Sequence, residues 1–146
     1  MRLVDVNVLV YAFREDAPGH TAHRAWLEGM LGSDEAYAVS DHVLASFLRI
    51  VTHPRVFHPA TPTDLALVFA AAIRDRPNAV PVAPGGRHWG IFTTLCRDVE
   101  ARGNLIPDAW LAALAIEHGC EFVTTDRDYA RFSQLRWRHP LENRRM

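Results

Sequence analysis

The first ten residues, MRLVDVNVLV (residues 1–10), carry the feature that decides the fold. Residues 2–6 are apolar or β-branched except Arg2 and Asp5, and Asp5 falls near the carboxyl end of the strand that they predict. A carboxylate inside an apolar strand costs several kcal/mol unless another group compensates for it, although a purely structural hydrogen-bonded acid is also possible. Residues 7–14 could extend the strand or form a short helix, and propensity does not decide between them.

Strand and helix patterns alternate along the rest of the chain. Further strands are predicted at residues 37–39, 80–82 and 121–125, with an edge strand at 134–138. Helices are predicted at 20–31, from Ser40 or Asp41 to 53, from the Thr61-Pro62 pair to about 74, at 87–101 and at 107–118, with a helical turn at 127–132. This alternation predicts an α/β fold with a mostly parallel sheet of four or five strands, covered on both faces.

Length and composition exclude several classes of protein. The 146 residues fit a single domain spanning 1–146, and 49% hydrophobic residues suffice for a core. A net charge of −1 excludes a wholly basic nucleic-acid coat, and no apolar run is long enough to cross a membrane. The amino-terminal segment lacks the pattern of a secretion signal, and two cysteines form no disulfide framework. We therefore expect a reduced, cytoplasmic protein.

All 16 basic residues are arginine, and the sequence contains no lysine. A P-loop, a Schiff-base enzyme and a lysine-activated aspartyl-phosphate site each need a lysine amine. The composition therefore excludes these three chemistries.

Three acids depart from the polar helix faces that hold most of the others. Asp5 lies near the end of the first strand, Asp126 follows the last strong strand, and Asp108 lies in the first turn of a helix. Asp108 could simply favour a helix amino terminus, and Asp126 could be a turn or cap residue. Because ligands of parallel sheets bind outside the carboxyl ends of the strands, we expect the acids to share one rim.

Carboxylates that lie close together repel one another, so protons or a cation must neutralise part of the charge of the cluster. Two carboxylates ~4 Å apart repel by ~4 kcal/mol at an effective dielectric of 20. An oxygen-only ligand set suits Mg²⁺ or Mn²⁺, and such an ion can activate water for attack on a phosphodiester. The acids therefore predict a magnesium or manganese site.

Three segments together resemble PIN-domain ribonucleases, with the strongest likeness to the VapC toxins of bacterial toxin–antitoxin pairs. The segments are LVDVNVLVYAF (3–13), LASFLRIVTHPRVF (44–57) and GNLIPDAWLAALAIEHGCEFVTTDRDYARF (103–132). The resemblance covers nearly the whole chain. It implies a three-layer α/β/α sandwich, an acidic Mg²⁺ site, cleavage of structured RNA, a homodimer and inhibition by a cognate VapB-like antitoxin.

The resemblance assigns roles to particular residues. Asp5, Asp108 and Asp126 match the family's catalytic, metal-binding acids. Auxiliary positions are Asn7, two residues after the first acid, Thr124, two before the last, and Asp128, a helix-face residue that could assist.

One position departs from the family pattern. Ser46 stands where the family has a glutamate in the second helix, so the metal site has one charge fewer. Asp41 and Glu35 are nearby acids that could compensate. If neither does, we expect weaker metal binding, and a catalytically weakened RNA- or antitoxin-binding module becomes the alternative function.

Arginines are expected to bind RNA phosphates around the acidic rim. Arg49 and Arg55 flank the Ser46 position, and residues 127–146 carry a local excess of basic charge, although a solvated carboxyl terminus would also explain it. The arginines of that segment are Arg127, Arg131, Arg136, Arg138, Arg144 and Arg145.

The remaining histidines and tryptophans suggest no chemistry. His20 and His23 are expected on the surface, and Trp26, Trp89 and Trp110 in the core or at an interface. Asp5-x-Asn7 also resembles the start of aspartyl-phosphate phosphatases, but these need the missing lysine. A metal-dependent endoribonuclease that acts as a toxin is the function the sequence favours.

Overall fold

The computed structural model describes residues 1–142, and its centre is a five-stranded sheet. The strands are β1 (Arg2–Val4), β2 (Tyr37–Val39), β3 (Ala79–Pro81), β4 (Glu121–Val123) and β5 (Trp137–Arg138). They lie in the order β3-β2-β1-β4-β5, and every neighbouring pair is parallel. The predicted parallel sheet is therefore confirmed, with β1 at its middle.

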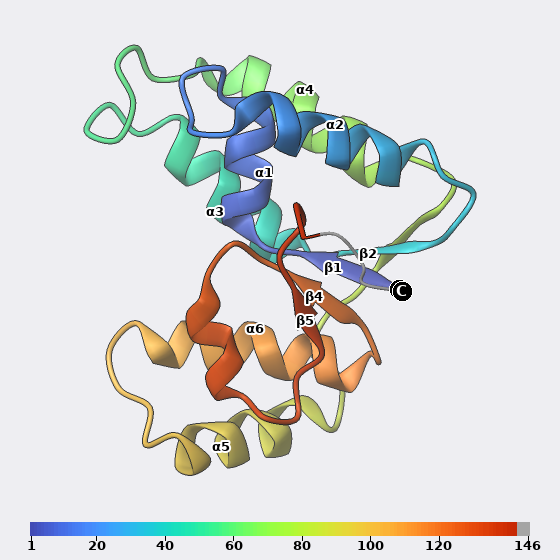
Figure 1. Ribbon diagram of the computed structural model, residues 1–146, viewed down its shortest axis with the longest axis vertical. Helices are drawn as coiled ribbons and strands as arrows, with labels where there is room; N and C mark the ends of the chain where they lie inside the picture. Colours follow the sequence, from blue (N-terminus) through green and yellow to red (C-terminus); the bar gives the residue numbers. More distant parts are fainter. Residues whose placement is uncertain (143–146) are drawn as a thin grey trace.

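Helices cover both faces of this sheet (Figure 1). The helices on one face are α1 (Val6–Phe13), α2 (His20–Leu31), α3 (Asp41–Val51) and α4 (Thr63–Arg74). On the other face lie α5 (His88–Asp98) and α6 (Leu105–Glu117), and the 3-10 helix η1 (Arg127–Arg131) joins β4 to β5. The three-layer α/β/α sandwich is confirmed.

The core continues from the sheet into both helical layers. All three residues of β2 are buried, as expected for a strand covered on both faces. Helix α6 buries a run of small residues, Ala112, Ala113 and Ala115, beside Leu111 and Leu114. These alanines let the helix axis approach the sheet closely. Within residues 1–142, no helix is both long and apolar enough to cross a bilayer.

The first strand is shorter than predicted, and this changes the setting of Asp5. β1 ends at Val4, and Asp5, with φ −73° and ψ 157°, is the N-cap of α1. Its side chain accepts a hydrogen bond from the Val6 amide, which is free at a helix start. Residues 6–13 are therefore helical, which settles the alternative between strand and helix.

Three further predictions were wrong in detail. Thr61 does not cap α4, which begins at Thr63, because its hydroxyl accepts a hydrogen bond from Arg14 instead. His23 was expected at the surface but is only 5% exposed on α2. Trp89 is 70% exposed on α5, so of its two predicted places, core or interface, only the interface remains. The edge strand also shortens to residues 137–138, since only those pair with β4.

Candidate active site

The order in which the chain adds strands to the sheet changes direction at the β1–β4 pair. From β1 it proceeds outward to β2 and β3, and it then returns to place β4 on the other side of β1. Such a switch point leaves a crevice at the carboxyl ends of the two central strands. Asp5 follows β1 directly, and Asp126 lies three residues after the end of β4.

Asp5 is the most constrained carboxylate of the crevice. It is 6% exposed, and it accepts hydrogen bonds from the Val6 amide (2.7 Å), the Thr124 hydroxyl (2.7 Å) and the Asn7 amide Nδ2 (3.2 Å). Burial, helped by the charges of Asp108 and Asp126, raises the pKa of Asp5 to about 6 in spite of these hydrogen bonds. The chain therefore holds a carboxylate where its charge is costly.

Thr124 and Asn7 connect Asp5 to the segment that carries Asp126. The Thr124 hydroxyl accepts a hydrogen bond from the Asp126 amide (3.0 Å), and the Asn7 side-chain oxygen accepts one from the Thr125 amide (3.3 Å). Both auxiliary residues therefore lie beside the acids, as predicted. Their role is to fix Asp5 and the start of the segment after β4.

Asp126 and Asp108 reach the crevice from two other elements. Asp126 caps η1 by accepting a hydrogen bond from the Asp128 amide (2.9 Å), and Asp108 projects from the first turn of α6. The Tyr129 hydroxyl donates a hydrogen bond to Asp108 (3.2 Å). Burial raises the pKa of Asp108, and the charges of Asp126 and Asp128 add to the shift.

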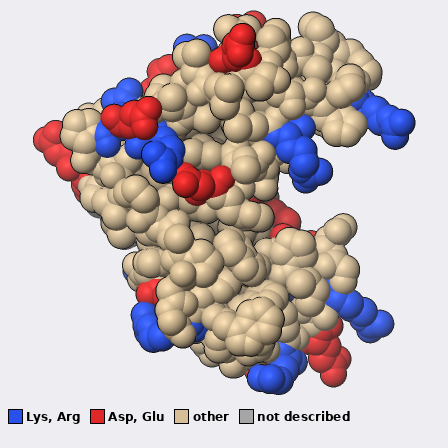
Figure 2. All heavy atoms as spheres, turned by 180° about the vertical axis from the view of Figure 1, so that it is seen from behind, with Lys and Arg blue, Asp and Glu red and all other residues tan. Residues whose placement is uncertain are grey.

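The three acids line one open cavity of about 470 Å³. Figure 2 shows the molecule hollowed on one side between its two helical layers, with acidic side chains in the hollow and arginines above it. The other residues that line this cavity are Val6, Asn7, Val10, Tyr11, His42, Ser46, Arg49, Ile50, Val56, Phe57, Pro107, Leu111 and Tyr129.

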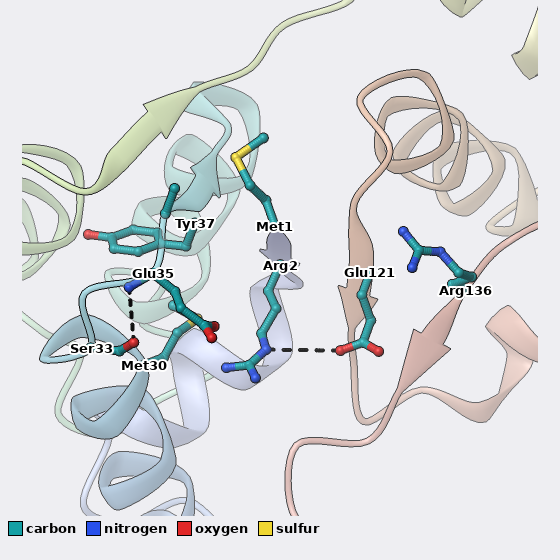
Figure 3. Close-up of a pocket in the computed structure, with 9 residues that line it drawn as sticks. Met1, Arg2, Met30, Ser33, Glu35, Tyr37, Glu121 and Arg136 are labelled. Atoms are coloured by element: carbon teal, nitrogen blue, oxygen red, sulfur yellow. Dashed lines mark hydrogen bonds and ion pairs between the residues drawn. The ribbon is translucent and has the colours of Figure 1, made fainter. Parts of the chain in front are cut away.

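Ser46 faces this cavity, but the two acids that could have compensated for it do not. Asp41 forms an ion pair with Arg74 (2.8 Å) on the outer surface. Glu35 lines a different cavity, of about 430 Å³, together with Arg2 and Arg136 (Figure 3). That cavity lies at the amino ends of the strands, across the sheet from the three acids. The proposed compensation is therefore wrong.

The predicted arginines do not all lie at the carboxyl ends of the strands, where the acids are. Arg49 lines the acidic cavity, and Arg55 is exposed on the loop that follows α3. Arg127 forms an ion pair with Glu142 (2.9 Å), and Arg131 is exposed at the end of η1.

The basic carboxyl-terminal segment does not gather at the acidic rim. Arg136 lies at the amino ends of the strands and donates a hydrogen bond to the Gly119 carbonyl. The Arg138 Nε atom lies 3.3 Å from Glu121 Oε1 at the same end of the sheet. Because β5 runs parallel to β4, the residues that lead into it lie at the amino ends of the strands, and the Arg138 side chain reaches back to Glu121, the first residue of β4. Arg144 and Arg145 lie outside the described residues.

Asp128 contributes its backbone amide to Asp126, while its side chain is exposed and does not line the cavity. Tyr129, His42 and Phe57 do line it, and sequence reasoning missed all three. Tyr129 had a signal, since it stands three residues after Asp126 at the start of a helical turn. His42 and Phe57 had none.

The oxygen-only set of Asp5, Asp108 and Asp126 suits a hard divalent cation, which would offset their mutual repulsion. Within residues 1–142, no three His, Cys, Asp or Glu side chains converge closely enough to enclose an ion by themselves.

Comparison with known proteins identifies the family. Residues 2–135 match the family model described as PIN domain. Ribonuclease VapC43 of Mycobacterium tuberculosis is 48% identical over 143 residues, which cover 97% of each chain. Ribonuclease VapC25 of the same organism is 43% identical over 140 residues, 96% of this chain and 99% of the relative. The chain therefore belongs to the PIN domain family, as a protein of the VapC type.

Solved structures share the fold at low sequence identity. VapBC2 from Rickettsia felis, solved with a DNA fragment from their promoter, has a TM-score of 0.70 at 17% identity and covers 94% of this chain and 97% of its own. VapBC-1 from nontypeable Haemophilus influenzae has a TM-score of 0.67 at 15% identity and covers 97% and 98%. At these identities the likeness bears on the fold alone.

We predict that Asp5 destabilises the metal-free protein at neutral pH. Its pKa is about 6 in the folded chain and 3.8 in an ordinary carboxyl, so the folded state binds the proton more tightly. The associated stability is present below pH 3.8 and is lost as the pH rises through about 6, by up to about 3 kcal/mol in total.

The measurement is urea unfolding of the wild type and Asp5→Asn, in chelator, from about pH 4 to about pH 7. The stability of the wild type should fall relative to Asp5→Asn across this range. The stability difference between the wild type and Asp34→Asn, which changes an exposed acid that does not line the cavity, should show no such trend. A constant difference between the wild type and Asp5→Asn would contradict the prediction.

Tyr129→Phe should lower the free energy of unfolding by about 1.5–3 kcal/mol, the usual contribution of a hydrogen bond to a charged group. The ring remains buried, and only the bond to Asp108 is lost. Tyr11→Phe is the control, because Tyr11 lines the same cavity but donates to no carboxylate within residues 1–142. Equal effects of the two substitutions in denaturant unfolding would refute this role of Tyr129.

Proposed function

We propose that this chain is a divalent-metal-dependent endoribonuclease and the toxin of a toxin–antitoxin pair. The observation that carries the proposal is the meeting of Asp5, Asp108 and Asp126, from three separate elements, in one cavity at the switch point of the sheet. The names of the relatives, which are VapC ribonucleases, support the same activity.

Each residue of the cavity has a distinct part in the proposed reaction. Asp5, Asp108 and Asp126 hold the cation, for which Mg²⁺ is the first choice and Mn²⁺ the second. When bound, such an ion lowers the pKa of water and stabilises the leaving oxygen of a phosphodiester. Thr124 and Asn7 fix Asp5 by hydrogen bonds, as Tyr129 fixes Asp108.

Arg49, on α3, adds positive charge to the lining of the cavity that holds the acids. A guanidinium binds phosphate oxygens in a bidentate manner, so it can hold the RNA backbone while the bond is cut. Arg55, on the following loop, and Arg131, at the end of η1, extend this role to phosphates farther along the strand. We expect a structured RNA, such as tRNA or rRNA, as the substrate.

We further propose a VapB-like antitoxin as a partner and a homodimer as the assembly. Both solved neighbours are VapBC proteins, which supports the antitoxin. Large apolar side chains are exposed on two helices, Leu65 and Val68 on α4 and Trp89 on α5. Exposed apolar surface of this kind fits contact with other chains.

A second function is favoured by one observation. Ser46 faces the cavity at the position where the family has a glutamate, and neither Asp41 nor Glu35 replaces that charge. A protein that binds RNA or an antitoxin with weakened catalysis is therefore the alternative.

RNA cleavage with and without Mg²⁺ separates the two functions. The wild type should cut RNA only with a divalent ion, and Asp5→Asn should lower the rate by roughly 100-fold or more, since cation stabilisation contributes several kcal/mol. Asp41→Asn, on the outer surface, should cut at the wild-type rate. Binding of RNA by the wild type without cleavage would favour the alternative.

Ser46→Glu should tighten Mg²⁺ binding by roughly 10-fold, because affinity rises with the number of carboxylates around the ion. Ala45→Glu is the matched control, since it adds the same charge one residue away at an exposed position of α3. Calorimetry on both variants separates a local ligand from a general charge effect. Unchanged binding in Ser46→Glu would show that position 46 does not face the metal.

A further inference from the structure

Arg14 anchors the middle and the end of the loop between α3 and α4. Arg14, which follows α1, donates to the Pro59 carbonyl (2.9 Å) and to the Thr61 hydroxyl (3.1 Å). Its guanidinium also lies over the Phe57 ring, with 4.3 Å between Cζ and the ring centroid. One side chain therefore contacts three positions of the loop.

Arg14 is itself neutralised by an acid two residues away. It forms a bidentate ion pair with Asp16, with distances of 2.8 Å and 2.6 Å. This contact raises the pKa of Arg14 and lowers that of Asp16. Because both ends of its guanidinium are occupied, Arg14 positions the loop and does not serve as a phosphate ligand.

The anchored loop presents two apolar side chains to the acidic cavity. The His53 carbonyl accepts hydrogen bonds from the amides of Val56 (3.0 Å) and Phe57 (3.1 Å), which closes a tight turn. Both side chains line the cavity, and Val56 is 53% exposed. Val56 and Phe57 therefore give a cavity with a polar, acidic side an apolar wall.

Helix α3 connects this apolar wall to the polar part of the cavity. Ser46, Arg49 and Ile50 lie at i, i+3 and i+4, so they share one helix face, and all three line the cavity. Arg49 provides the charge, and Ile50 continues the apolar wall toward Phe57. The lining of the cavity therefore combines three acids, the positive charge of Arg49 and an apolar wall.

We propose that Val56 and Phe57 form a subsite for one unpaired nucleobase next to the phosphate that is cut. The inference rests on the proposed function. The arginine and the acid cluster, once it holds a cation, would bind a phosphate, and the apolar wall would bind a flat apolar group. A nucleotide carries both groups. Only an unpaired base exposes its face for such a contact, because paired bases are stacked within a helix.

The test measures coupling between one base and one side chain. A short single-stranded RNA of mixed sequence, with one nucleotide at a time made abasic, is titrated into the protein in an Asp5→Asn background that prevents cleavage. Phe57→Ala should weaken binding of the intact RNA by roughly 5- to 150-fold, the range for loss of one base–aromatic stack. Removal of the matching base should weaken binding to the parent protein but not to Phe57→Ala.

Two variants control for packing and position. Phe57→Leu keeps most of the buried volume but has no aromatic face, so it should lose the coupling while the thermal midpoint stays near that of the parent. Leu141→Ala removes an apolar side chain that is 41% exposed and does not line the acidic cavity. It should bind both RNAs like the parent.

Arg14→Gln tests the anchor. It should reduce the base coupling in the same way as Phe57→Leu but leave the affinity for the abasic RNA unchanged, since the phosphate contacts do not involve Arg14. A merely structural role would weaken both RNAs equally.

The outcomes separate the subsite from the proposed activity. If the wild type cuts RNA but no abasic position couples to Phe57, the subsite is wrong and the ribonuclease stands. If coupling is present but no cleavage is observed with Mg²⁺, the ribonuclease activity is wrong, and the base-binding site stands without its place beside a cut phosphate. If the Phe57 variants lose affinity only for an antitoxin, the wall belongs to a protein interface and the inference is overturned.

Discussion

The carboxylate of Asp5, buried at the carboxyl end of the central strand, is the constraint around which the site is built. Its charge is removed from water, and three hydrogen bonds, from the Val6 amide, Thr124 and Asn7, offset only part of the cost. These donors come from the start of α1 and from the segment after β4. Holding Asp5 therefore requires β1 and β4 to be neighbours, as the sheet order makes them.

The same constraint explains the chemistry that the cavity offers. Asp108 and Asp126 add charge beside a carboxylate that is already destabilised, so a cation is the natural means of relieving the repulsion. Tyr129 reduces part of this cost by donating to Asp108. Ser46 is neutral, and it lines the cavity at the position that the resemblance assigns to a glutamate. The site therefore has less repulsion between carboxylates and less attraction for an ion than a site with four acids.

The sheet and the acids were predictable because local pattern and topology act together there. Apolar runs specify the strands, and the rule that parallel strands end at one edge brings Asp5 and Asp126 together. The same reasoning did not place the arginines of the carboxyl-terminal segment correctly. Arg136 and Arg127 are close in sequence, yet the segment between them runs back along the sheet, so Arg136 emerges at the amino ends of the strands, where it lines the cavity that Glu35 also lines.

The sequence by itself determined the parallel α/β fold, the three acids and the absence of lysine chemistry, since each depends on residue type and order alone. Tertiary structure alone decided what surrounds the acids. Arg14 and Phe57 are far apart in sequence, and no periodicity links them, but the loop after α3 folds back onto the end of α1 and brings them into contact. His23 is buried and Trp89 exposed for the same reason, because burial depends on the neighbouring element and not on the polarity of the side chain.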